Sequence, residues 1–361
     1  MDARGPVGIS LLTLVPGLVG GSETYARELL KALAARDRFA YRVFLPSLAP
    51  KAGAGLPATI VRGYRAGRTV PARLLAMSAA AIHPWPLRRE MNLDGLRAIH
   101  FPLSVMLPPV GRPPAVSTVL DLQHEFLPGF FNPAELAYRR LVYGWTVRRS
   151  RIVITISEHA RQTLIERLGL EPERVRAIHL GVDLEAFGPD PRVERAPFLL
   201  YPANRWPHKN HERLLAAFAI LRRTRPELRL VLTGAFHEGR PVPEGVESLG
   251  LVSRERLLEL YRTAAALVFP SLYEGFGQPP LEAMACGCPV AVSRTGPLPE
   301  IYGEAAAYFD PTSAEDIAET VDRLLAAPAP FVSLGLETAA RYTWERCARR
   351  HEEVYAELLS L

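Results

Sequence analysis

The sequence predicts an α/β protein with two doubly wound parallel sheets. Short apolar runs typical of strands alternate with amphipathic runs typical of helices, which indicates parallel sheets covered by helices on both faces. The alternation occurs in two series, separated by the turn-rich segment 181–191. The length of 361 residues also fits two domains. We expect these domains at 1–183 and 184–342, facing a central cleft.

The first series opens with the apolar run Val7–Val15, which leads directly into a glycine turn. Because this run lacks the basic flank and the cleavage site of a signal peptide, we interpret it as the first strand. Residues 50–75, rich in Gly, Pro, Ala and Arg, are expected to form a mobile loop. The remaining patterns predict helices at 22–35, 134–149 and 158–168, and strands at 41–45, 96–101, 115–122, 151–157 and 174–178.

The second series repeats this alternation. It predicts strands at 198–202, 229–233, 246–249, 266–270 and 290–293, and helices at 211–224, 254–263, 281–286 and 313–326. A last helix, 343–361, follows this series and is expected to cross back onto the first domain. Ligands of such sheets bind at the carboxyl ends of the strands, so a site is expected in the loops that follow the strands.

The composition indicates a cytoplasmic protein. The three cysteines, Cys286, Cys288 and Cys347, are too few for a disulfide framework and are not spaced as zinc ligands. This cysteine usage favours a reducing compartment. No apolar run in the sequence is long enough to span a bilayer.

Positive charge is concentrated in the first half of the chain. Residues 1–183 carry a net charge of +10 and the remainder −5. Many of these cations lie between positions 62 and 97: Arg62, Arg65, Arg68, Arg73, Arg88, Arg89 and Arg97. With apolar residues 74–81 and Trp85, they suggest a face that docks on the anionic inner surface of the plasma membrane. We expect no nucleic-acid partner, because the stretch lacks a recognisable nucleic-acid-binding pattern.

Glu274 and Glu282 form the most informative pair in the chain. They lie in a segment that follows a predicted strand and contains the loop Gly275-Phe276-Gly277. Two prolines at 279–280 favour a helix start, which would place Glu282 in the first turn, where the helix dipole stabilises negative charge. Two acids beside exposed loop amides can bind the hydroxyls and the phosphates of one ligand.

A second candidate is the turn formed by Gly20 and Gly21, which follows the first strand and opens a helix. Glycine allows the backbone to approach an anion closely at such a turn. The segment does not match G-x-G-x-x-G, and no acidic residue closes the predicted strand 41–45. Dinucleotide binding is therefore disfavoured.

Other strand-to-helix loops carry polar candidates. Lys209 and Arg205 can neutralise a diphosphate, and Asn210 can cap the following helix. Asp121 and His124 follow a first-domain strand and can bind a sugar or assist proton transfer. Two further loops offer backbone donors or a surface for a flat base: Gly296, and Gly250-Leu251-Val252.

Together these segments resemble the retaining, nucleotide-sugar-dependent glycosyltransferases of family 4, which have the GT-B fold. The resemblance extends over nearly the whole chain and points to bacterial polysaccharide-assembly enzymes, many of them mannosyltransferases. The segments that carry it are 20–21, 154–158, 179–183, 208–210, 232–234, 274–282, 287–290 and 309–311.

The resemblance implies a role for each motif. Glu282 would bind the ribose hydroxyls of the nucleoside, and Glu274 would lie near the donor sugar with the amides of Phe276 and Gly277. Lys209 would contact the donor diphosphate. Gly21 is similar to the loop glycine that approaches the donor phosphate and the acceptor.

Two positions depart from the family pattern. Many relatives carry a histidine directly before Asp121; Leu120 stands there, and His124, one turn further on, is the alternative. Relatives also often carry an arginine five positions before the lysine. Asn204 occupies that place beside Arg205, so either of the two would meet the diphosphate.

The expected reaction is transfer of a hexose from a nucleoside-diphosphate sugar to a saccharide or lipid-linked acceptor, with retention of configuration. GDP-mannose is the first expected donor and a UDP-hexose the second. No Asp-x-Asp motif is suitably placed, so we expect no metal and no cofactor. The alternatives are a GT-B-fold epimerase or phosphorylase, and a non-catalytic sugar-nucleotide-binding partner of another transferase.

Overall fold

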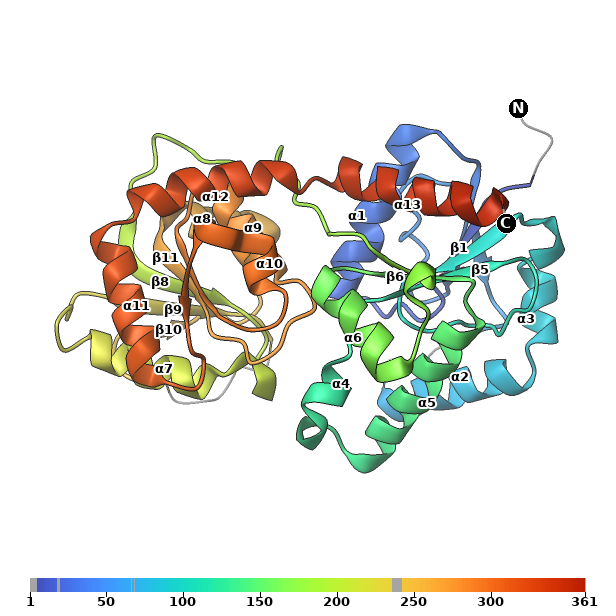
Figure 1. Ribbon diagram of the computed structural model, residues 1–361, viewed down its shortest axis with the longest axis horizontal. Helices are drawn as coiled ribbons and strands as arrows, with labels where there is room; N and C mark the ends of the chain where they lie inside the picture. The colour runs from blue at the N-terminus through green and yellow to red at the C-terminus, as the bar shows by residue number, and fades with distance from the viewer. Residues whose placement is uncertain (1–4, 18–19, 66, 68, 236–241, 361) are drawn as a thin grey trace. The chain divides into compact units, whose positions relative to one another are not determined.

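The computed structural model describes residues 5–17, 20–65, 67, 69–235 and 242–360. The chain divides into two compact units (Figure 1). Unit 1 comprises residues 1–124, 131–180 and 344–361, and unit 2 comprises residues 125–130 and 181–343. Each unit contains one sheet, and every strand pair in both sheets is parallel. The predicted α/β class with two parallel sheets is therefore confirmed.

The sheet of unit 1 has the strand order β3-β2-β1-β4-β5-β6-β7. Its order reverses between β1 and β4, as in doubly wound folds. The strands are β1 (Val7–Ser10), β2 (Tyr41–Pro46), β3 (Ala58–Val61), β4 (Ala98–Phe101), β5 (Ala115–Val119), β6 (Ile152–Thr155) and β7 (Val175–Ala177). The helices are α1 (Gly21–Arg36), α2 (Val70–Ile82), α3 (Trp85–Glu90), α5 (Pro133–Arg149), α6 (Glu158–Leu168) and α13 (Trp344–Ser360). Helix α4 (Gln123–Phe126) lies where the chain passes from unit 1 to the segment 125–130.

The sheet of unit 2 has the strand order β10-β9-β8-β11-β12-β13, with the reversal between β8 and β11. The strands are β8 (Ala196–Pro202), β9 (Arg229–Thr233), β10 (Val246–Ser248), β11 (Ala264–Phe269), β12 (Val290–Ser293) and β13 (Ala306–Phe309). The helices are α7 (His211–Leu221), α8 (Arg254–Thr263), α9 (Gln278–Ala285), α10 (Leu298–Tyr302), α11 (Ala314–Ala326) and α12 (Ala329–Arg341).

The central strands are almost wholly buried because helices cover both faces of each sheet. All four residues of β4, β6 and β12 are buried. The first strand is shorter than the predicted Val7–Val15. The chain turns after Ser10, and Leu11, Leu12 and Leu14 remain buried in the turn. Their hydrophobicity thus reflects burial rather than strand structure.

The expectation of a mobile loop over residues 50–75 is wrong for two parts of that range. Residues Ala58–Val61 form β3, which pairs with β2 at the edge of the sheet, and α2 begins at Val70. An edge strand needs only four residues and one partner. The Ala-Thr-Ile-Val run of β3 is therefore hard to recognise as a strand within a Gly- and Pro-rich segment. Helix α12 and strand β13 were not expected either.

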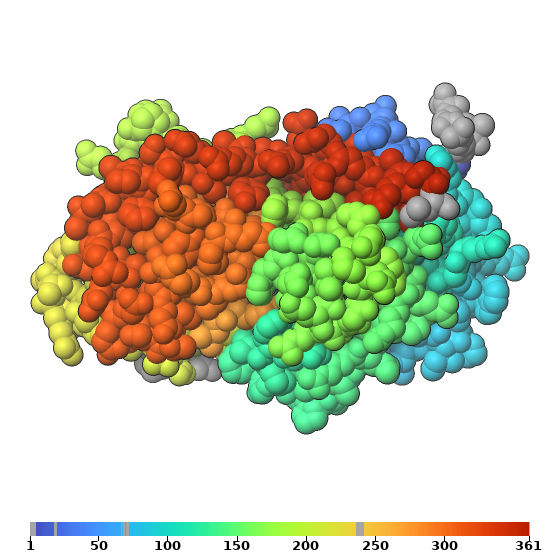
Figure 2. Space-filling view, viewed as in Figure 1, coloured from blue at the N-terminus to red at the C-terminus, as the bar shows by residue number. Residues whose placement is uncertain are grey.

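The last helix, α13, belongs to unit 1 and packs against α1. Its outer side is visible at the molecular surface in red in Figure 2. On its inner side, the Nε2 atom of His351 lies 2.9 Å from the hydroxyl of Tyr25 on α1. That hydroxyl also lies 2.9 Å from Thr118 Oγ1 on β5. Burial lowers the pKa of His351 to about 4, so its ring is neutral at pH 7.

Candidate active site

Lys209 and Glu274 form an ion pair in unit 2, with Nζ 2.6 Å from Oε1. Lys209 lies in the loop after β8, and Glu274 lies in the loop after β11. Strands β8 and β11 are neighbours at the point where the strand order reverses, so their loops emerge side by side at the carboxyl edge of the sheet. The pair is mostly buried, with exposed fractions of 17% and 12%.

The backbone around Lys209 is fixed by its neighbours. The chain makes a 3₁₀ turn at Pro207–Lys209, and the Tyr201 hydroxyl donates to the Lys209 carbonyl at 2.7 Å. The Leu272 N–H donates to the His208 carbonyl at 2.8 Å, which connects the two loops. The ammonium also lies 5.2 Å from the centre of the Phe269 ring. These contacts give the ammonium a defined position before any ligand binds.

His208 lies beside the ion pair but was expected only as part of a motif, without a role. Burial and the positive charge of Lys209 lower the pKa of His208 to about 4, against a smaller opposing effect of Glu274. The ring is therefore neutral at pH 7 and adds no positive charge to the site.

Asn210 does not act as the predicted N-cap. It stands before α7 in the left-handed conformation, with φ of 59°, and its side chain makes no capping hydrogen bond. Its amide instead donates to the carbonyls of Pro270, at 3.0 Å, and Pro311, at 2.8 Å. Asn210 thus connects three strand-to-helix loops, which stabilises the edge of the sheet where Lys209 lies.

Glu282 lies in the second turn of α9, because the helix begins at Gln278 rather than at the prolines. The predicted first-turn dipole effect therefore does not apply, since that effect fades beyond the first turn. Instead, the buried hydroxyl of Tyr261 on α8 donates to Glu282 Oε2 at 2.9 Å. Nothing in the sequence pattern pointed to Tyr261, which occupies a core-facing helix position.

The Gly275-Phe276-Gly277 loop joins the two acids. Gly277 has φ of 93°, and a Cβ there would lie 2.6 Å from Leu298 Cδ2. The buried Tyr302 hydroxyl donates to the Gly277 carbonyl, and Phe276 is buried against Tyr342. Burial raises the pKa of Tyr302, and the charges of Glu274 and Glu282 raise it further.

Asn204 and Arg205 lie upstream in the loop after β8. The Asn204 Oδ1 accepts from the Ala235 N–H at 2.8 Å, and the Arg205 N–H donates to the Ala235 carbonyl at 3.0 Å. Asn204 is therefore used to join the loops after β8 and β9. The Arg205 side chain is half-buried.

The remaining unit 2 candidates are loop residues. Gly250, with φ of 63°, accepts at its carbonyl from the Gly234 N–H at 2.7 Å, and the next residue, Leu251, is 75% exposed. Val252 follows it and is half-buried. Gly296, with φ of 54°, lies between β12 and α10. All these residues follow carboxyl ends of strands in the same sheet as the Lys209–Glu274 pair.

Four candidates lie in unit 1. Gly20 precedes α1 with φ of 49°, and a Cβ on Gly20 or Gly21 would meet no atom within 4 Å, so space is open beside the turn. The Asp121 Oδ1 accepts from the Gln123 N–H at 3.1 Å. His124 is buried, with Tyr143 edge-on at 5.2 Å between ring centres. Asp121 is therefore the more accessible of the two polar side chains.

Within the described ranges, no group of three or more His, Cys, Asp or Glu side chains is arranged to hold a metal ion. None of the described helices combines the length and the hydropathy needed to cross a membrane.

Comparison with known proteins gives concordant matches for both halves. Residues 19–186 match the model described as Glycosyltransferase Family 4, and residues 185–341 match that of Glycosyl transferases group 1. The chain is 28% identical over 268 residues to the O-antigen chain mannosyltransferase B of Escherichia coli, covering 67% of this chain and 70% of that protein.

Solved structures share the fold. A sucrose-phosphate synthase from Thermosynechococcus elongatus aligns with a TM-score of 0.80 and 21% identity, covering 99% of this chain and 100% of that one. An Anabaena protein solved in complex with UDP and glucose aligns with a TM-score of 0.71 and 17% identity, covering 98% and 100%.

Proposed function

The chain belongs to glycosyltransferase family 4, a retaining and metal-independent family of GT-B fold, and we propose that it transfers a hexose, with mannose as the first candidate, from a nucleoside-diphosphate sugar to a saccharide or lipid-linked acceptor. The observation that carries the proposal is the Lys209–Glu274 ion pair at the reversal of strand order in unit 2. Doubly wound sheets bind nucleotides at such a point.

Lys209 would stabilise the leaving diphosphate. As the glycosidic bond breaks, negative charge develops on the diphosphate oxygens, and a fixed ammonium stabilises that charge without reorganisation. Glu274 holds the ammonium at 2.6 Å. Amides of the loop that contains Gly296 would add donors, and the acceptor hydroxyl would attack the face that the diphosphate leaves.

Glu282 would select the nucleoside. Its Oε2 accepts from the Tyr261 hydroxyl, which orients the carboxylate and leaves acceptor capacity for ribose hydroxyls. The exposed Leu251 and its neighbours, Gly250 and Val252, would contact the base. GDP-mannose is the first donor that we propose, and the name of the Escherichia coli relative supports mannose as the transferred sugar. A UDP-hexose is the second, supported by the Anabaena complex with UDP and glucose.

The test combines binding with turnover. Thermal-shift measurements with GDP, UDP, ADP and their sugars identify the donor, because a ligand that binds the folded state raises its apparent stability. Transfer from the stabilising donor is then measured on a saccharide acceptor, with product configuration read by NMR. Glu282→Ala is expected to lower kcat/KM for the donor at least about tenfold. Donor binding without transfer to any acceptor would instead favour a non-catalytic sugar-nucleotide-binding partner.

We also propose that unit 1 docks on the inner face of the plasma membrane. Helices α2 and α3 expose large apolar side chains, with exposed fractions of 74% for Leu75, 71% for Ile82 and 73% for Trp85. Arg88 lies over the Trp85 ring at 5.3 Å, so a cation accompanies this apolar face. Such a combination favours anionic interfaces. Arg68, part of the predicted arginine stretch, lies outside the described residues.

Vesicle sedimentation tests this docking. The protein is expected to bind phosphatidylglycerol vesicles more tightly than phosphatidylcholine vesicles, and Trp85→Ser with Ile82→Ser should weaken the binding. The matched control is Trp206→Ser, which removes an exposed tryptophan from unit 2. Equal binding by the docking variant and the control would refute the assignment of the face.

A further inference from the structure

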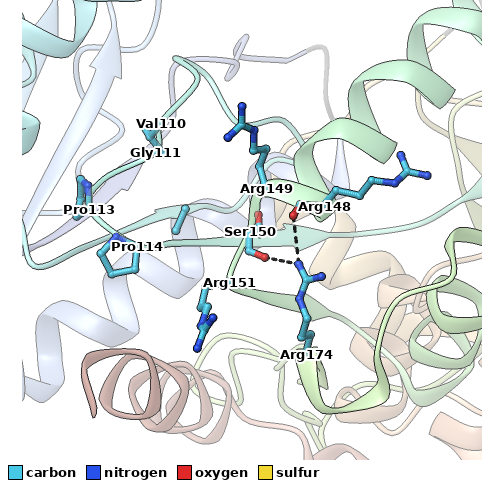
Figure 3. A pocket seen from close by; sticks show the side chains of 10 residues that line it. Val110, Gly111, Pro113, Pro114, Arg148, Arg149, Ser150, Arg151 and Arg174 are labelled. Carbon is cyan, nitrogen blue, oxygen red and sulfur yellow. Dashed lines mark hydrogen bonds between the residues drawn. The ribbon is translucent and has the colours of Figure 1, made fainter. Parts of the chain in front are cut away.

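A pocket of about 440 Å³ lies in unit 1, at the amino ends of three strands (Figure 3). Ala115 begins β5, Arg151 directly precedes β6 and Arg174 directly precedes β7. A pocket of this volume is within the range that small-molecule ligands occupy. Its lining consists of Val110, Gly111, Pro113, Pro114, Ala115, Arg148, Arg149, Ser150, Arg151 and Arg174.

The pocket is separate from the candidate active-site residues of unit 1. Gly20 and Asp121 follow the carboxyl ends of β1 and β5, whereas the pocket is at the amino end of β5. The two edges are separated by the length of a five-residue strand, about 15 Å. A ligand in the pocket therefore need not be the donor or the acceptor of the transfer.

The charge of the lining is entirely positive. Four of the ten lining residues are arginines, and none is acidic. Across the described part of unit 1, carboxylates do pair with other arginines, as in Arg161–Glu158 and Arg176–Glu357. The three exposed arginines of the pocket, Arg148, Arg149 and Arg151, form no such ion pair there. Their mutual repulsion would be relieved by an external anion.

Arg174 prepares the pocket for an anion. The carboxyl end of α5 carries partial negative charge on its last carbonyls, which would oppose anion binding. The Nη2 of Arg174 donates to the carbonyl of Val147 at 3.0 Å and to that of Ser150 at 2.5 Å. The last turn of the helix is thus neutralised from within the protein, so the other three arginines are available to a ligand.

The other three arginines lie around the end of α5. In Figure 3, Ser150 lies near the middle with Arg174 below it, and Arg148, Arg149 and Arg151 extend from the adjoining backbone in different directions. All three are exposed, and arginine side chains have several rotatable bonds, so each can turn toward a bound anion. The opposite, non-polar wall consists of Val110, Gly111, Pro113 and Pro114.

We infer that this pocket, called here the arginine pocket, binds a phosphate-bearing small molecule with more than one negative charge. The planar guanidinium group matches phosphate oxygens in bidentate geometry, and several such groups favour a diphosphate or a triphosphate over a single carboxylate. The phosphate group belongs either to a soluble phosphate ester or to a lipid head group, and both present the same chemistry to the pocket.

Calorimetric titration with inorganic pyrophosphate tests the arginine pocket on the full chain. The double variant Arg149→Gln/Arg151→Gln is expected to bind pyrophosphate at least about tenfold more weakly than the wild type. The matched control, Arg349→Gln/Arg350→Gln, removes the same charge from the exposed side of α13 and should bind like the wild type. Equal affinity of the pocket variant and the control overturns the inference.

Pyrophosphate could also bind near Lys209, so the titration is repeated with Lys209→Ala. The arginine pocket predicts that binding survives this substitution. Loss of all binding in Lys209→Ala, with retention in the pocket variant, would assign the anion to the donor site and overturn the inference. A failure of the proposed transferase function leaves this result unchanged, because neither measurement depends on turnover.

A second measurement needs no variant. Phenylglyoxal modifies accessible arginines, and peptide mass spectrometry reports each position. Pyrophosphate is expected to protect Arg148, Arg149 and Arg151 but not Arg349. Equal modification with and without pyrophosphate overturns the inference.

Sedimentation with phosphatidylglycerol vesicles then distinguishes the two sources of the phosphate group. Weaker sedimentation of the pocket variant than of its control supports a lipid head group, and equal sedimentation supports a soluble phosphate.

Discussion

The ammonium of Lys209 lies 2.6 Å from the carboxylate of Glu274, although the two residues are 65 positions apart in the chain. The contact exists because the strands that precede them are adjacent and parallel. It places a fixed cation and an acid at the edge of the sheet where ligands of doubly wound folds bind.

Replacing Lys209 by alanine should lower turnover at least about tenfold, which corresponds to about 1.4 kcal/mol of transition-state stabilisation. The reason is that the leaving diphosphate loses its positioned cation, while Glu274 is left unpaired in a mostly buried place. Steady-state kinetics with the donor found by thermal shift measures the effect. Lys51→Ala, an exposed lysine of unit 1, is the control. Unchanged turnover in Lys209→Ala would refute the assigned role.

Tyr261→Phe should raise KM for the donor about fivefold and change kcat little. The substitution removes the hydroxyl that donates to Glu282 Oε2, at a cost of about 1 kcal/mol for an ordinary hydrogen bond. If the carboxylate binds ribose equally in the ground state and the transition state, only KM responds. Tyr308→Phe, which removes a hydroxyl bound to the Gly303 carbonyl, is the control. An effect confined to kcat would contradict a positioning role in binding.

Gly277→Ala should destabilise the fold by about 2 kcal/mol or more. The residue has φ of 93°, and a Cβ would lie 2.6 Å from Leu298 Cδ2 and 2.8 Å from the Tyr302 hydroxyl, so strain adds to crowding. Urea unfolding measures the change. Gly169→Ala is the matched control, because Gly169 also has a positive φ but no atom within 4 Å of its Cβ position. Equal losses in the two variants would show that crowding at Gly277 contributes nothing.

Acid should destabilise unit 1 through His351. Its pKa is about 4 in the folded state and about 6.5 when unfolded, so the unfolded chain binds the proton more readily between these values. The contribution of His351 to the free energy of unfolding is fully present above pH 6.5 and is lost as the pH falls toward 4. The total loss is on the order of 3 kcal/mol. The buried His100, whose pKa is also lowered by burial, acts in the same direction.

Urea unfolding of His351→Gln at pH 7 and pH 5 checks this expectation. The variant should show a smaller loss of unfolding free energy between the two pH values than the wild type. His83→Gln, at an exposed position after α2, should keep the wild-type difference. The same pH dependence in all three proteins would contradict the assignment to His351.

Transfer activity should persist in EDTA. The proposed stabilisation of the leaving diphosphate comes from Lys209 and backbone amides, and a positioned ammonium supplies the charge that a divalent ion would otherwise provide. Initial rates with and without EDTA, followed by addition of Mn²⁺, measure the dependence. A rate that appears only after Mn²⁺ is added would refute the proposed electrostatics.

The sequence alone determined the fold class, most element positions and the family. Local patterns are sufficient for these features. Helix α6 and strand β9 lie at their predicted residues because their periodicity and their polar boundaries are local properties. The prediction for 50–75 was wrong because β3 is held by its pairing with β2, and a four-residue edge strand has little pattern of its own.

Tertiary structure decided the partners of the polar groups. Asn210 was expected to cap its own helix, but it binds the carbonyls of Pro270 and Pro311, which the sheet order brings near. Glu282 was assigned to a helix dipole, but it is held by Tyr261 from another helix. The physical reason is the same in each case: a side chain binds whichever group lies within hydrogen-bond distance in space, and spacing along the chain does not specify that distance.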